Sequence, residues 1–110
     1  MSRPIDPQAA LQAMWDLAPK YAAAKGERVY LEEYRKTLKA TLMKACRETA
    51  IGAQEREAYA APEYAELLKG LQAAVEAEET LRWRLVSAQA AVEVWRSQEA
   101  SNRAMDRAAA

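Results

Sequence analysis

The stretch from Pro62 to about Arg107 constrains the fold most, because it has no internal proline and only one glycine, Gly70. Mostly apolar residues recur in it at alternating steps of four and three, the spacing of a coiled-coil seam. This seam consists of Leu67, Leu71, Ala74, Glu78, Leu81, Leu85, Ala88, Val92 and Trp95. A second apolar line on nearly the opposite side consists of Trp83, Val86, Ala90 and Val94. A helix that is apolar on two faces must be covered on both, so we predict that a partner subunit covers the second face.

The composition favours an all-α fold. About a quarter of the 110 residues are alanine, the best helix former, and the chain has few glycines and no phenylalanine. A chain of this length forms one domain with a modest core. We therefore predict a small helical bundle with a long C-terminal helix that oligomerises.

Local signals divide this single helical domain, residues 1–110. Asp6-Pro7 is a good helix start, Ile51-Gly52-Ala53 is a break, and Ala61-Pro62 is another. Pro19 and Gly26 should each weaken or kink a helix. The predicted segments are a loose N-terminus (1–6), N-terminal helices kinked near 19 and 26 (7–49), a break with a short helix (50–61) and the long helix (62–107).

Two apolar faces are expected before the break. One comprises Leu11, Met14, Trp15 and Ala18, and the other comprises Leu31, Tyr34, Leu38, Leu42 and Ala45. At helical spacing each set lies on one side. We expect Trp15 to be a core or interface anchor.

The sequence indicates no chemistry. It has no histidine, the commonest metal ligand and general base, and its one cysteine, Cys46, can form no internal disulfide. It contains no phosphate-binding loop, dinucleotide fingerprint or nucleophile elbow. We predict no enzyme, no metal and no cofactor. Without a membrane-spanning apolar run or a signal-peptide core, we also predict a cytoplasmic protein that does not enter a membrane.

Charge is unevenly distributed although the net charge is zero. A basic segment runs from Lys20 to Arg47, an acidic one from Glu48 to Glu79, and a mildly basic tail begins at Thr80. Two interpretations remain open: the segments attract each other within the fold or between subunits, or the basic segment forms a binding face.

The basic segment places its cations within one third of the circumference of a helix. They are Lys25, Arg28, Arg35, Lys36, Lys39 and Arg47, with Glu32 in the same arc. This arc is either a solvated face with helical ion pairs or a phosphate-binding stripe. A second candidate, on the long helix, combines Arg82, Arg96, Arg103 and Arg107 with Trp83 and Trp95, because arginine interleaved with aromatic residues can bind single strands.

The run Arg35-Lys36-Thr37-Leu38-Lys39-Ala40-Thr41-Leu42 resembles a motif of phage recombination-mediator proteins of the UvsY type, whose pattern is Leu-Lys-Ala-Arg-Leu. The segment Ala50-Ile51-Gly52-Ala53-Gln54-Glu55-Arg56-Glu57 resembles the part after their break. The resemblance covers roughly residues 26 to 103. Lys39 matches the family's lysine, whereas Thr41 stands where the family has arginine, so Lys36, Lys44 and Arg47 would substitute for that contact.

The resemblance implies a ring-like homo-oligomer that binds single-stranded DNA and helps load a recombinase onto strands covered by a single-strand-binding protein. The expected nucleic-acid-binding residues are Arg35, Lys36, Lys39, Lys44 and Arg47. The expected oligomer interface comprises Leu81, Trp83, Leu85, Val92 and Trp95. The alternative is a helical adaptor or scaffold that binds only protein.

Overall fold

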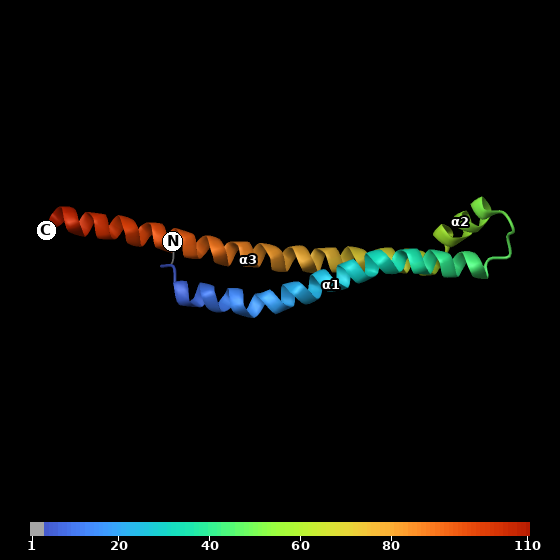
Figure 1. Ribbon diagram of the computed structural model, residues 1–110, viewed down its shortest axis with the longest axis horizontal. Helices are drawn as coiled ribbons and strands as arrows, with labels where there is room; N and C mark the ends of the chain where they lie inside the picture. The colour runs from blue at the N-terminus through green and yellow to red at the C-terminus, as the bar shows by residue number, and fades with distance from the viewer. Residues whose placement is uncertain (1–3) are drawn as a thin grey trace. The chain divides into compact units, whose positions relative to one another are not determined.

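The computed structural model describes residues 4–110, and the all-α prediction is confirmed over that range, which contains three helices and no strand. Helix α1 spans Pro7–Ala45, α2 spans Ile51–Ala60 and α3 spans Pro62–Ala109 (Figure 1). The first three residues of the segment predicted to be loose lie outside the described residues.

The local sequence explains where α1 begins and where α2 gives way to α3, but the break predicted at Ile51-Gly52-Ala53 is wrong, since these residues form the first turn of α2 and the chain leaves the helix at residues 46–50 instead. Asp6 caps α1, since its Oδ1 accepts hydrogen bonds from the backbone N–H groups of Gln8 and Ala9 at 3.0 and 3.2 Å. Helix α1 continues through Pro19 and Gly26 and ends at Ala45. Ala61 has an extended backbone, with ψ of 141°, because the proline ring that follows disfavours the helical conformation there. The chain therefore turns sharply between α2 and α3.

The described chain forms two compact units. The central unit, residues 22–79, contains the second part of α1, all of α2 and the first part of α3. The terminal unit consists of residues 4–21 and 80–110, which are the first part of α1 and the rest of α3. In each unit, a segment of α1 packs antiparallel to a segment of α3.

The seam of α3 lies where its spacing predicts. Leu67, Ala74 and Glu78 are buried in the central unit, and Ala88 is buried in the terminal unit. The remaining seam positions are half-buried, namely Leu71, Leu81, Leu85, Val92 and Trp95. The opposite line is exposed, with 58% of Trp83 and 47% of Val94 accessible to solvent. The chain itself therefore covers the first apolar face and leaves the second open.

The seam of α1 differs from the predicted faces. Trp15 was expected to anchor the core or an interface; it is 80% exposed and so does not lie in the core of this chain, and its role at an interface stays a prediction. Tyr34 and Ala45 are also exposed, whereas the predicted Met14, Leu31, Leu38 and Leu42 are half-buried. The half-buried positions include Leu17 and Tyr21 in the terminal unit, and Ala24 and Arg28 in the central unit.

Arg28 occupies a seam position because it meets a buried carboxylate. Its Nη2 donates a hydrogen bond of 3.1 Å to Glu78, its Nε donates a second, and its Nη1 donates one of 2.9 Å to Glu32. These hydrogen bonds raise the pKa of Arg28, and the contribution of Glu78 is larger than that of Glu32. A buried charge is tolerated only when paired and hydrogen-bonded in this way. Apolarity alone could not have identified this position.

Leu67 and its neighbour Leu68 provide a matched test of the seam, since one is 8% and the other 45% exposed. Leu67→Ala should lower the free energy of unfolding by about 2–3 kcal/mol, because it leaves a cavity. Leu68→Ala should cost less than about 1 kcal/mol, since the side chain is already half in water. Urea denaturation followed by circular dichroism measures both, and equal losses would contradict the register described here.

Candidate nucleic-acid interface

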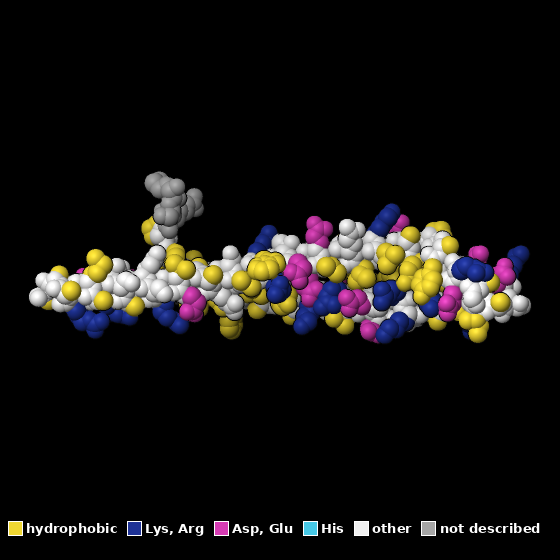
Figure 2. All heavy atoms as spheres, turned by 90° about the horizontal axis from the view of Figure 1, so that it is seen from above, with side chains coloured by type: hydrophobic (Ala, Val, Ile, Leu, Met, Phe, Trp, Pro, Cys, Tyr) yellow, Lys and Arg dark blue, Asp and Glu magenta, His cyan; other side chains and the backbone are white. Residues whose placement is uncertain are grey.

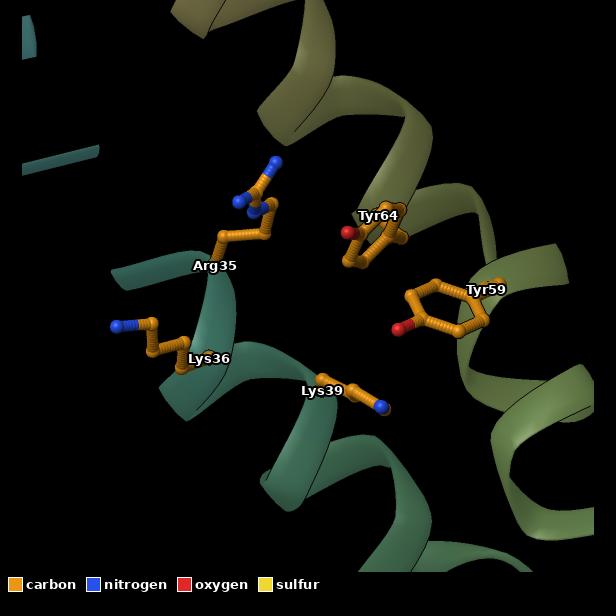
Figure 3. A pocket seen from close by; sticks show the side chains of 5 residues that line it. All are labelled: Arg35, Lys36, Lys39, Tyr59 and Tyr64. Atoms are coloured by element: carbon orange, nitrogen blue, oxygen red, sulfur yellow. The ribbon is translucent and has the colours of Figure 1, made fainter. Parts of the chain in front are cut away.

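An open hollow of about 490 Å³ lies in the central unit where its three helical segments meet. Helix α1 contributes Arg35, Lys36 and Lys39, α2 contributes Tyr59, and α3 contributes Tyr64 (Figure 3). The lining therefore combines three cationic side chains with two aromatic rings. Three of the five residues predicted to bind nucleic acid come together here.

The local sequence explains how these groups meet. Lys36 and Lys39 follow Arg35 by one and four positions, so the three side chains emerge from neighbouring parts of one helical face. The extended Ala61 turns the chain between Tyr59 and Tyr64, whose rings form an edge-to-face pair with centroids 5.1 Å apart. Ala58, only 1% exposed, anchors α2 to the rest of the unit. The tyrosines thus have a fixed place opposite the basic face.

Lys39 is engaged by groups of α2. Its Nζ lies 3.7 Å from a carboxylate oxygen of Glu55 and 4.8 Å from the centroid of the Tyr59 ring. The hydrogen bond with Tyr59 and the charge of Glu55 raise the pKa of Lys39, although burial opposes this shift. The lysine is therefore fully charged at neutral pH, and part of its charge is already compensated.

The other two cations are more available. Lys36 and its partner Glu33, at 3.2 Å, are both about 70% exposed, and such surface pairs contribute little to stability. Arg35 is exposed and has no ion pair with any described residue. Figure 3 shows its guanidinium directed towards the side of the hollow where Tyr64 lies.

The remaining predicted cations lie elsewhere. Lys44 is exposed near the end of α1 and does not line the hollow. Arg47 lies beside a separate hollow of about 340 Å³, together with Cys46 and Glu57. Arg28, part of the predicted basic arc, is bound to Glu78. The basic arc is consequently divided in the structure.

The alternative arginine line lies in the terminal unit. Arg82 stacks on its neighbour Trp83, 5.0 Å from the ring, and Arg96 pairs with Glu93 at 3.5 Å. Arg103 and Arg107 lie in the stretch from residue 100 to 110, all of which is exposed. Arg96 also lines a hollow of about 420 Å³, whose other lining residues are Leu11, Met14, Gln89, Val92 and Glu93. No aromatic ring faces a basic residue in that hollow.

Sequence reasoning did not select Glu55, Tyr59 or Tyr64. The available signal was the position of both tyrosines on either side of the Ala61-Pro62 break, which brings them together. Their approach to α1 depends on the packing of helices remote in sequence, which periodicity within one helix cannot reveal.

The predicted oligomer interface is distributed over two faces. Leu81, Leu85, Val92 and Trp95 are half-buried in the seam of the terminal unit. Only Trp83 lies on the exposed face, whose other large apolar members are Val86 and Val94.

Comparison of the chain with known protein families, curated proteins and solved structures finds no match. Among residues 4–110, the side chains form no cluster of three or more histidine, cysteine or acidic groups suited to a metal ion. Over the same range, no helix contains a stretch that is both long enough and apolar enough to span a lipid bilayer. The geometry thus defines a helical protein with a basic and aromatic surface hollow.

Proposed function

We propose that this protein binds single-stranded DNA and that the hollow lined by Arg35, Lys36, Lys39, Tyr59 and Tyr64 is the binding site. The observation that carries the proposal is the joint presence of cations and an accessible tyrosine, since Tyr59 is 50% exposed. Cations neutralise phosphates, and aromatic rings stack on unpaired bases regardless of sequence.

A single strand fits this hollow better than a duplex. The faces of paired bases are hidden inside a duplex by stacking, whereas an unpaired base is free to lie against a ring such as Tyr59. Duplex readout instead requires a helix or ribbon that enters a groove with side chains aimed at base edges. Phosphate contacts carry no base information, so binding should be indifferent to sequence.

One copy offers only about three phosphate contacts, which is weak at physiological salt. We therefore also propose that the protein acts as a homo-oligomer, in which several copies of the hollow share one strand and raise the effective concentration. The exposed stripe of Trp83, Val86 and Val94 supports this part of the proposal. So does the limited core, since the described residues of α1 include no fully buried side chain.

The resemblance to mediators of the UvsY type supports a finer proposal. The protein would help to load a recombinase onto single strands that are already covered by a single-strand-binding protein. Lys39 is the matching residue that also lines the hollow. The cytoplasm, where such loading takes place, is the corresponding location.

The alternative function is a scaffold that binds only protein. On the face seen in Figure 2, Lys and Arg side chains are mixed with Asp and Glu side chains, and no large area of a single sign is visible. Charges of both signs on one face can be matched by complementary charges of a protein partner. Absence of single-stranded DNA binding at low salt would favour this alternative.

The binding site is tested by titrating a fluorescent oligodeoxythymidine into the protein over a salt series. Arg35→Ala combined with Lys36→Ala should weaken binding and reduce the salt slope by about 0.7 for each lost contact. Tyr59→Ala should weaken binding about tenfold, because stacking contributes about 1–3 kcal/mol per base.

Lys25→Ala and Tyr30→Ala are the controls, since both residues are exposed on the same unit and lie outside the hollow. They should leave affinity nearly unchanged. Equal losses in the control and hollow variants would refute the site, and the arginine line of α3 would replace it.

The oligomer is tested by light scattering at micromolar concentration. Wild-type protein should have a mass of more than one subunit. Trp83→Asp should reduce that mass without unfolding the chain, because the new charge would be desolvated only in the interface. Met105→Asp is the control, since Met105 is a 69% exposed residue of α3 outside the stripe. A monomeric wild-type protein would contradict the proposal.

A further inference from the structure

Lys39 occupies the hollow in a way that conflicts with its use as a phosphate ligand. In Figure 3 its ammonium is directed towards Tyr59, whereas that of Lys36 points away from the rings. The same ammonium is 3.7 Å from Glu55 and 4.8 Å from the centre of the Tyr59 ring. Lys39 thus neutralises a carboxylate and lies over a face of the ring that would stack on a base.

A strand entering the hollow therefore competes with groups of the protein itself. A phosphate can use the full charge of Lys39 only if Glu55 releases it. A base can use the covered face of Tyr59 only if the ammonium moves away. One rotation of the lysine side chain would meet both requirements, since Lys39 is the member common to both contacts.

We propose that Glu55 is a built-in competitor that holds Lys39 over Tyr59 in the free protein, so that the phosphate of an incoming single strand must displace the carboxylate. This inference rests on the function proposed above and extends it to the control of affinity at the same site. Glu55 therefore sets a threshold for binding. A short anion that contacts one hollow does not displace the carboxylate from Lys39, whereas a strand that contacts several hollows at once gains enough binding free energy to displace it in each of them.

The exposure of the two partners permits such an exchange without unfolding. The side chain of Lys39 is 29% exposed and that of Glu55 is 45% exposed. Both contacts are made by the flexible end of the Lys39 side chain, so the helices need not move. An ion pair of this kind is weak enough for a phosphate to displace, since phosphate is itself a strong partner of lysine.

Glu55→Gln tests the competition. It keeps the size of the side chain and removes its charge, so it should raise the affinity for oligodeoxythymidine by about two- to fivefold. The salt dependence of binding should become steeper, because salt no longer weakens a competing ion pair at the same time. Glu57→Gln makes the same charge change two residues along α2, where the carboxylate faces the separate hollow beside Arg47, and should have a much smaller effect.

A double variant separates competition from simple repulsion between Glu55 and the strand. In a Lys39→Ala background, Glu55→Gln should no longer increase affinity, because the carboxylate acts through Lys39. Repulsion alone would give the same gain in both backgrounds. Circular dichroism should show unchanged helix content in every variant, so that affinity changes report on the site.

The two proposals fail in different ways. If wild-type protein binds single strands but Glu55→Gln and Glu57→Gln raise affinity equally, the competition is refuted and the binding function stands. The same holds if the gain persists without Lys39. If neither wild-type protein nor Glu55→Gln binds single strands at low salt, the binding function itself is refuted, and the competition with it.

Discussion

The contact between Arg28 and Glu78 is the constraint on which the central unit depends. Both residues occupy positions of the helical seam, and each would be costly there without the other. A polar pair within an apolar seam specifies register, since sliding one helix along the other would leave a buried charge unpaired. With α1 and α3 aligned at this point, Arg35 and Lys39 are placed opposite the turn that carries the tyrosines. The composition of the hollow therefore follows from the register.

The uneven charge of the sequence leads to ion pairs within the fold, which is the first of the two interpretations considered above, whereas a binding face on the basic segment stays a prediction. Arg28 and Lys39 of the basic segment form ion pairs with Glu78 and Glu55 of the acidic segment. Part of the charge of the basic segment is therefore compensated within the fold. On the same helical face, Arg35 has no ion pair with a described residue, and Lys36 makes only an exposed pair with Glu33. A net charge of zero is compatible with nucleic-acid binding under these conditions, because local cations, not the sum over the chain, contact phosphates.

Much of the fold is predictable from the sequence, whereas only part of the candidate site is. The seam of α3 follows from the alternation of Leu67, Leu71 and their successors, because a regular pattern on one helix determines its buried side. The seam of α1 is harder to predict, since Arg28 is charged but half-buried and Trp15 is apolar but exposed. The cations of the hollow were identifiable from one helix. Tyr59 and Tyr64 were not, because their approach to α1 requires the packing of three segments.

Photo-crosslinking tests most directly whether the hollow binds single-stranded DNA. An oligonucleotide with photoreactive thymine analogues, irradiated in complex with wild-type protein and mapped by mass spectrometry after trypsin digestion, reports which side chains contact bases. The predicted result is a crosslink at Tyr59, within the peptide formed by residues 57–69 between Arg56 and Gly70. Crosslinks confined to Trp83 or Trp95 would contradict this account and place the strand on the C-terminal part of α3.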